Sequence, residues 1–316
     1  MKKIILLPII LGSVLLVAGG VLFAVAIANN VGSGKLVDKT YDVTESFENI
    51  DVDLTTADLT FKKATDGNKK VVLREKEKEY HVVSVDNNTL SIKAKDDRKW
   101  YEKMFTFDFQ PMTVEVYLPA GDYVDLSLES ATGNVNISKD FSFANFSCKL
   151  STGNVSVSSS VSNKMEIKTS TGNIAYSEAS CKTLNVYAST GNINLNKVSV
   201  TEDIDIKVST GKIKFDDTTF NNLTIKSSTG DITLADSVGA GKITIKTNTG
   251  DVKFDDADAA ELEITTDTGD VTGRLLTSKM FSAHSDTGRV KVPEFSTGGH
   301  CKITTDTGDI NITIKE

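Results

Sequence analysis

Ten Thr-Gly pairs recur through the last 185 residues of this 316-residue chain, and each step between them is 19 or 20 residues. A unit of about 20 residues is too small to bury its own apolar face, so such units must stack on one another. The repeat therefore predicts a solenoid, a chain wound into stacked coils. The ten repeating glycines are Gly133, Gly153, Gly172, Gly191, Gly211, Gly230, Gly250, Gly269, Gly288 and Gly308.

Alignment of the units on glycine places apolar residues seven and five positions before it and two and four positions after it. Ile243, Ile245, Val252 and Phe254 show the pattern around Gly250. Alternation with a period of two predicts strands whose apolar side chains share one face. We therefore expect an all-β fold, a single-stranded parallel β-solenoid or β-helix of about ten coils, in which each coil rests on its predecessor.

Each glycine is expected to form a corner between two strands. A sharp bend there requires either a positive φ or a backbone approach that leaves no room for a Cβ. Asparagines follow the first four corner glycines, and stacked copies of them are expected to form a ladder of side-chain amides that holds the register. These residues are Asn134, Asn154, Asn173 and Asn192.

The amino terminus carries a candidate membrane segment. Lys2 and Lys3 precede the uncharged residues 4–28, which as a helix are long enough to cross a bilayer. A secretory signal peptide cleaved after residues 26–28 is the alternative, but its apolar core would be shorter. We expect residues 1–34 to be a retained transmembrane anchor and short linker, with a cytoplasmic amino terminus and residues 35–316 extracytoplasmic.

Residues 35–120 lack the repeat but contain several alternating segments, such as 50–54 and 114–118. Residues 55–58 resemble a decayed corner, so the winding is expected to begin irregularly here. We expect residues 35–120 to form an N-terminal β-rich cap region, and residues 121–316 to form the solenoid.

An aromatic cluster lies within the expected cap region. Either these side chains cover the first coil, or they form a contact patch for protein or lipid near the membrane. The residues are Trp100, Tyr101, Phe105, Phe107 and Phe109.

The chain has a formal net charge of −8, and residues 250–316 are its most acidic part. This argues against a nucleic-acid partner, which requires a basic stripe along its phosphates. Cysteines number three, Cys148, Cys181 and Cys301. Cys148 and Cys301 occupy positions that are apolar in other coils, which favours small core residues over a disulfide framework.

Three features together resemble a known family. They are the run YDVTESFENIDV at 41–52, the run VEVYLPAG at 114–121, and the serial Ser-Thr-Gly-Asn units. They are similar to the bacterial putative-adhesin family of β-strand-repeat proteins, a domain of unknown function often found behind a single membrane segment. The resemblance implies a β-solenoid displayed in the cell envelope, with some relatives encoded beside envelope-stress signalling systems. It implies no catalytic residues.

Acidic corners in the last coils suggest a calcium site, because stacked carboxylates repel and calcium takes several oxygen ligands. We expect solvated turn aspartates and no bound metal, with calcium as the alternative. The candidate ligands are Asp267, Asp270, Asp286, Asp306 and Asp309.

Catalytic signals are weak. Adjacent acids at Asp216 and Asp217, and at Asp255, Asp256 and Asp258, fall in return connections, where such acids are usually only solvated. The three histidines lack ligand spacing, and the glycines do not form a phosphate loop. We therefore expect no enzyme activity and no cofactor.

The sequence thus predicts a membrane-anchored extracytoplasmic β-solenoid that acts as an adhesin-like binding or scaffold surface in the bacterial envelope. Its expected partners are the membrane, through the N-terminal helix, and another envelope protein or a cell-surface polymer. Self-assembly through an exposed end strand is a further hypothesis. The alternatives are an accessory protein of envelope-stress signalling and a polysaccharide-processing enzyme.

Overall fold

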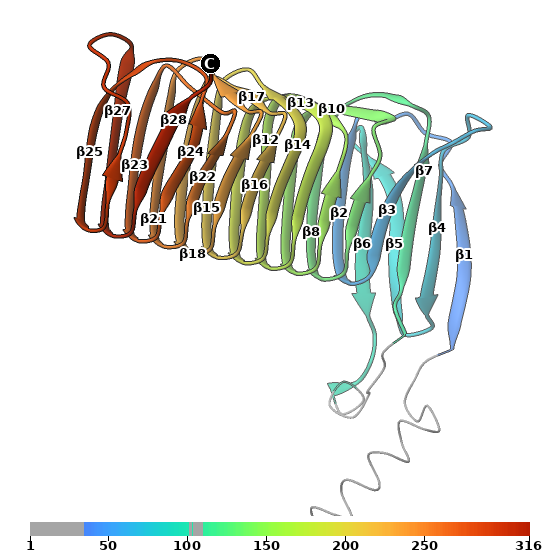
Figure 1. The fold of residues 1–316 in the computed structure, drawn as a ribbon. Helices are drawn as coiled ribbons and strands as arrows, with labels where there is room; N and C mark the ends of the chain where they lie inside the picture. Colours follow the sequence, from blue (N-terminus) through green and yellow to red (C-terminus); the bar gives the residue numbers. More distant parts are fainter. Residues whose placement is uncertain (1–34, 101–102, 104–109) are drawn as a thin grey trace, which may run out of the picture.

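The computed structural model describes residues 35–100, 103 and 110–316, and all of its named elements are strands of one continuous sheet. Figure 1 shows a rod of stacked coils with the N-terminal strands at one end. The expected parallel β-solenoid of about ten coils is confirmed. In the described part of the chain, no helix is long and apolar enough to cross a membrane. The expected anchor, in residues 1–34, lies outside the described residues.

Each coil contributes one strand before its corner glycine and one after it. The strands that end at a corner are β8 (Gly121–Thr132), β10 (Phe141–Thr152), β12 (Ser160–Thr171), β13 (Ile174–Thr190), β15 (Asp203–Thr210), β18 (Asn222–Thr229), β21 (Lys242–Thr249), β23 (Glu261–Thr268), β25 (Lys279–Thr287) and β27 (Gly299–Thr307). Those that follow a corner are β9 (Val135–Ile137), β11 (Val155–Val157), the first part of β13, β14 (Ile193–Val200), β16 (Ile213–Asp216), β19 (Ile232–Ala235), β22 (Val252–Asp255), β24 (Val271–Leu275), β26 (Val290–Lys291) and β28 (Ile310–Ile314). Two short strands, β17 (Thr219–Phe220) and β20 (Val238–Gly239), lie in the return connections.

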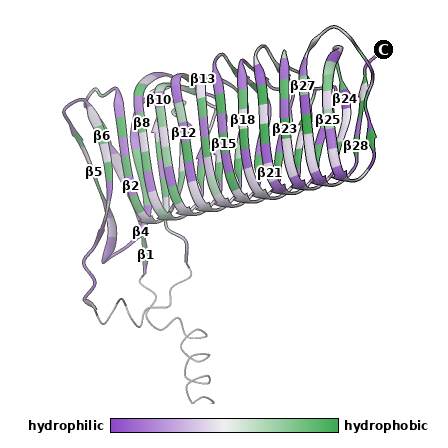
Figure 2. Cartoon of the chain, turned by 90° about the vertical axis from the view of Figure 1, so that its left-hand side faces the viewer, coloured by the Kyte–Doolittle hydropathy of each residue, from purple (hydrophilic) through white to green (hydrophobic). Residues whose placement is uncertain are grey.

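The core is a set of inward rows along the rod. Alternate residues of each strand are buried, and the alternation of apolar and polar residues is visible in Figure 2. Large side chains such as Tyr176, Phe215 and Phe254 are fully buried. Cys148, Cys181 and Cys301 are also buried and free, and burial raises the pKa of each thiol to about 12. All three cysteines are therefore core residues, as expected for Cys148 and Cys301.

Both reasons expected for the corner glycines hold. Their φ angles lie between 137° and 159°, in the region that side-chain-bearing residues rarely adopt. A Cβ on Gly191 would lie 2.0 Å from the carbonyl oxygen of Gly172, the corner of the preceding coil. The backbones of successive corners are thus in direct contact, and no side chain fits between them.

The decayed corner at residues 55–58 is the first corner of the rod. Strands β2 (Asn49–Thr56) and β3 (Asp58–Lys63) pair in parallel with β8 and β9. Ala57 occupies the glycine position, and its carbonyl oxygen would lie 1.9 Å from a Cβ on Gly133. Alanine is tolerated because no earlier corner stacks against it.

The remaining N-terminal strands cover the open edges of this first coil. They are β1 (Leu36–Asp42), β4 (Lys70–Lys76), β5 (Glu79–Asp86), β6 (Thr89–Asp96) and β7 (Thr113–Leu118). β6 pairs in parallel with β2, and β7 pairs in parallel with β3. Antiparallel β5 lies beside β6, and antiparallel β4 and then β1 lie beside β7. The edges of the winding are therefore not open at this end.

The residue after the corner glycine forms a ladder along most of the rod, interrupted at Lys212, whose side chain offers no acceptor. The expected amide–amide bond joins Asn154 Nδ2 to Asn134 Oδ1 (3.2 Å), but most steps use a different bond. The Oδ1 atom of Asn134 accepts the backbone N–H of Asn154 (3.0 Å), and Asn154 Oδ1 accepts that of Asn173 (2.8 Å). The same bond runs from Asp270 N–H to Asp251 Oδ1 (2.9 Å). The ladder therefore joins a side chain to the backbone of the next coil, so aspartate serves as well as asparagine.

The expectation that every coil rests on its predecessor is wrong for the last two coils. β27 pairs with both β23 and β25, and β28 pairs with both β24 and β26. The last coil in sequence is therefore inserted before the coil that precedes it, and β25 lies outermost in Figure 1. Any end-to-end pairing at this end would use β25 and β26 rather than the C-terminal strand.

Two glycines make this insertion sterically feasible. A Cβ on Gly298 would lie 2.1 Å from the carbonyl oxygen of Ser278, and a Cβ on Gly299 would lie 1.8 Å from that of Ala260. The returning chain thus passes in close contact with backbone on both sides, and larger residues would block it.

A buried ion pair lies beside the inserted coil. Lys279 Nζ is 2.8 Å from Asp258 Oδ1, and the two side chains are 2% and 4% exposed. Asp258 Oδ2 also accepts hydrogen bonds from the backbone N–H and the hydroxyl of Thr277, each at 2.7 Å. These bonds join the return connection of one coil to the first residue of β25.

Replacement of a corner glycine should destabilise the rod strongly. Gly191→Ala combines a clash with the Gly172 carbonyl and an unfavourable φ, and we expect it to lower the free energy of unfolding by about 4 kcal/mol. Gly121→Ala is the matched control, because Gly121 has a similar φ and open space around its Cβ position; its expected cost is about 1 kcal/mol. Urea titration measures both, and equal costs would contradict the role of the close approach.

The buried pair should behave as a unit. Asp258→Asn or Lys279→Met alone leaves a buried charge without its partner and should cost about 3 to 5 kcal/mol. The double variant removes both charges and should recover much of that loss. A double-mutant cycle on chemical unfolding measures the coupling, and simply additive costs would show that the pair does not act together.

Candidate binding groove along the lysine row

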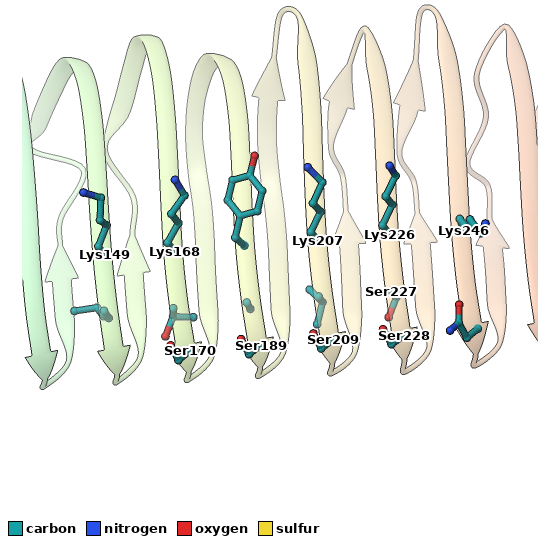
Figure 3. A pocket seen from close by; sticks show the side chains of 16 residues that line it. Lys149, Lys168, Ser170, Ser189, Lys207, Ser209, Lys226, Ser227, Ser228 and Lys246 are labelled. Atoms are coloured by element: carbon teal, nitrogen blue, oxygen red, sulfur yellow. The ribbon is translucent and has the colours of Figure 1, made fainter.

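One outward side chain per coil lies four residues before the corner glycine. In six successive coils, strand register places these side chains directly beside one another, from Lys149 at one end to Lys246 at the other. We call this set the lysine row, and Figure 3 shows it crossing the strands in single file. Its members are Lys149, Lys168, Tyr187, Lys207, Lys226 and Lys246.

The lysine row borders an open groove of about 710 Å³ on the outer face of the sheet. Nearer the corners the groove is lined by exposed serines, two residues before each glycine. In-register parallel strands lie about 4.8 Å apart, so six coils give a row about 24 Å long. The groove-lining serines are Ser170, Ser189, Ser209 and Ser228.

Like charges on neighbouring strands repel, and acidic side chains beside two of the lysines offset part of this repulsion. Glu129 lies 2.6 Å from Lys149, and Asp205 lies 3.1 Å from Lys207. Each of these contacts is a hydrogen bond to a carboxylate, which raises the pKa of the lysine. Both lysines are therefore firmly cationic at neutral pH.

Tyr187 replaces lysine in the third coil of the row without interrupting it. The Nζ atom of Lys168 lies 5.2 Å from the ring centroid, and that of Lys207 lies 5.0 Å from it. Ammonium groups over an aromatic face are attracted by its quadrupole. The ring thus holds the flanking ammonium groups in the row.

The other end of the row carries uncompensated charge. Lys226 and Lys246 make no ion pair within residues 35–100, 103 and 110–316, and the next position along the row is the neutral Thr265. Lys168 pairs with Glu166 on its own strand. The five lysines therefore share three acidic neighbours, and the excess positive charge lies at the Lys226 end.

The wider face is basic although the chain is acidic. Across these six coils, the outward positions eight, six, four and two residues before the corner hold more bases than acids. The lysines are Lys149, Lys164, Lys168, Lys207, Lys226, Lys242 and Lys246, and the acids are Glu166, Asp203 and Asp205. A chain of net charge −8 thus presents one locally positive face.

The calcium candidates do not meet at one point. Asp270 Oδ1 accepts the backbone N–H of Asp309 (2.7 Å), and Asp309 binds Arg289 through its side chain (2.7 Å). Asp286 pairs with His284 (2.8 Å). Within the described residues, no group of three or more His, Cys, Asp or Glu side chains has the arrangement of a metal site. Asp267 and Asp306 are exposed on neighbouring coils, and calcium binding at these corners stays an alternative hypothesis.

Several of the acids considered for catalysis form ion pairs with basic side chains. Asp216 pairs with Lys214 (2.9 Å), Asp256 pairs with Arg274 and Lys315, and Asp258 is the buried partner of Lys279. The pairs of Asp256 and Asp258 join neighbouring segments, whereas the Asp216 pair lies within β16.

The expected aromatic contact patch is described only in part. Trp100 is 72% exposed. Tyr101, Phe105, Phe107 and Phe109 lie outside the described residues, so the patch stays a prediction.

The lysine row was missed by the sequence analysis, although its signal is present in the sequence. Lysine stands four residues before five corner glycines, which becomes visible only when outward positions are aligned as carefully as inward ones. The negative net charge of the whole chain concealed the lysine row, because most of the acidic residues lie in other parts of the chain. A nucleic-acid partner was not expected because no basic stripe was recognised in the sequence. The lysine row is such a stripe, although a short one.

These features define a class of protein, a parallel β-solenoid with a cationic groove along one side. The Toastrack DUF4097 family matches residues 47–202 and 201–316, and the chain belongs to this family. No curated protein matches the sequence.

A solved structure shares the fold. A putative adhesin from Parabacteroides distasonis is similar over 89% of this chain and 98% of its own, with 15% identity and a TM-score of 0.51. A putative adhesin from Bacteroides fragilis covers 90% of this chain and 99% of its own, with 16% identity and a TM-score of 0.46. A putative lipid binding protein from Parabacteroides distasonis covers 87% and 96%, with 17% identity and a TM-score of 0.44. At these identities the likeness concerns the fold alone.

The lysine row should contribute little to stability. Exposed ion pairs are worth little, and Lys226 and Lys246 have none to lose, so Lys226→Gln with Lys246→Gln should change the free energy of unfolding by less than about 0.5 kcal/mol. Asn173→Ala removes the acceptor of the Asn192 N–H (2.9 Å) and should cost about 1 kcal/mol. Urea titration compares them, and a larger loss in the lysine variant would assign the row a structural role.

Proposed function

We propose that this protein is an adhesin-like binding protein of the bacterial envelope. Residues 1–34 anchor it in the membrane, residues 35–316 extend outside the cell, and the lysine row is its contact surface. The N-terminal strands cap the first coil and connect the rod to the anchor. The observation that carries the proposal is the continuity of the lysine row over six coils.

The energetics of the row support a binding role. Like charges directly opposite each other on neighbouring strands destabilise a sheet, and the row places lysines opposite each other in three steps. Neutral residues fit the same position, as Thr265 and Thr304 do in other coils. Lysines that are unfavourable for the fold, and replaceable within it, are explained by an external anionic ligand.

A rod of this type suits binding without chemistry. Repetition gives a long regular face, which a ligand engages through many equivalent contacts. The solved relatives named putative adhesins are in keeping with that role. We accordingly propose that the protein is not an enzyme and needs no cofactor.

Binding to the envelope tests this proposal. The full chain in neutral-lipid nanodiscs should co-sediment with envelope material isolated from the producing bacterium, and Lys226→Gln with Lys246→Gln should reduce the bound fraction severalfold. The matched control is Lys214→Gln with Lys253→Gln, which removes two exposed lysines from another face of the rod.

Equal sedimentation of the wild type and the row variant would show that the row is not the contact surface. Added protease should also digest residues 35–316 in intact cells, and their protection would contradict the extracytoplasmic location.

A further inference from the structure

We infer that the lysine row binds a linear polyanion laid along the axis of the rod, with about one anionic group for each coil. The inference rests on the proposed function, because it takes the row as the binding surface, and it adds the chemical class of the ligand. That class is an extended polymer with a phosphate or carboxylate on each repeating unit.

Spacing is the first argument for a polymer. The row is a single file of cations about 4.8 Å apart over about 24 Å, which no compact anion could span. An extended chain with a charge on every unit can contact all of the lysines at once. The row is also bounded, since Glu129 precedes Lys149 and the neutral Thr265 follows Lys246. The bound segment should therefore contain about six charged units.

Hydroxyl groups supply a second donor in four of the six coils. The same groove is lined by serines that lie two residues closer to the corner glycine than the lysine row does. They are Ser170, Ser189, Ser209 and Ser228. Within the described residues, their hydroxyls make no hydrogen bond to another side chain. An ammonium and a hydroxyl from one coil can together bind the oxygens of one anionic group. A lysine and a groove-lining serine occur together in three of the coils, so one polymer can use the same pair of donors at several points along the groove.

Tyr187 favours recognition of charge over stacking. Sugars and nucleic-acid bases bind to the faces of exposed aromatic rings, but the Tyr187 ring carries an ammonium group of Lys168 and of Lys207 at 5.2 and 5.0 Å. The ring is thus occupied and acts as a spacer between cations. A single-stranded nucleic acid would find phosphate contacts here but no stacking platform.

A membrane surface fits the row less well than a polymer does. Proteins that lie on membranes combine basic residues with apolar side chains that enter the lipid. None of the large exposed apolar side chains among the described residues lines the groove. Glu166 and Asp205 also border the row, so the cationic surface is a narrow line rather than a broad face.

Equilibrium binding to defined probes tests the inference. The full chain in neutral-lipid nanodiscs is titrated with linear polyphosphate, polygalacturonate, orthophosphate, a single-stranded oligonucleotide and anionic vesicles at several salt concentrations. At least one of the two polymers should bind far more tightly than orthophosphate. The slope of log K against log salt should be about −3.5, from about −0.7 for each of five neutralised charges. The tighter polymer then identifies phosphate or carboxylate as the recognised group.

Variants define the site. Lys226→Gln with Lys246→Gln should weaken polymer binding at least tenfold and bring the slope to about −2, because two of the five contacts are lost. Lys214→Gln with Lys253→Gln removes the same charge from the strands after the corner, so it should leave both the affinity and the slope unchanged. Circular dichroism melts confirm that both variants are folded.

Other outcomes overturn the inference. Orthophosphate binding as tightly as the polymers would indicate a local anion site, and vesicles binding as tightly would indicate a membrane surface. An oligonucleotide that binds more tightly than both polymers would indicate nucleic-acid recognition. Sedimentation with envelope material but no polyanion binding would refute the ligand class and leave the proposed function standing. Polyanion binding without envelope binding would refute the proposed function.

Discussion

The structure depends on the direct contact between the backbones of successive corners. At the ten Thr-Gly corners, a Cβ would lie 1.9 to 2.3 Å from a carbonyl oxygen of the adjacent corner, so only glycine permits the observed separation. Except beside Lys212, the N–H of the residue after the corner is then held by a carboxamide or carboxylate of the neighbouring coil. Together these contacts fix the register of every coil at one point. All other positions of the coil are aligned as a result.

Because the register is fixed, residues at the same position of successive coils lie beside one another along the whole rod. Inward positions become the continuous core, and the position four residues before the corner becomes the lysine row. The same alignment makes charge costly, since lysines lie directly opposite each other in three steps of the row. Tyr187 and the acids beside Lys149 and Lys207 relieve part of that repulsion. The remaining positive charge at the Lys226 end is available to a ligand.

The two ends of the rod are closed by different means. At the N-terminal end, five strands outside the winding occupy the edges of the first coil. At the other end the last coil of the sequence is inserted before its predecessor, so the first two residues of β28 are paired on both sides. The Lys279–Asp258 pair and the close passage of Gly298 and Gly299 accompany this exchange. β25 and β26 are left as the outer edge.

The sequence by itself determined the period, the corners and the inward rows, because each follows from local requirements: glycine at a tight contact and alternation along a strand. Even the first corner at residues 55–58 was recognisable without its glycine. Only the tertiary structure decided the order of the last two coils, because β25 and β27 carry the same pattern and either could pair with β23. The lysine row likewise became a surface only through register between strands some 20 residues apart. Local patterns specify the strands and the corner of each coil, whereas long-range strand pairing decides which coils are neighbours.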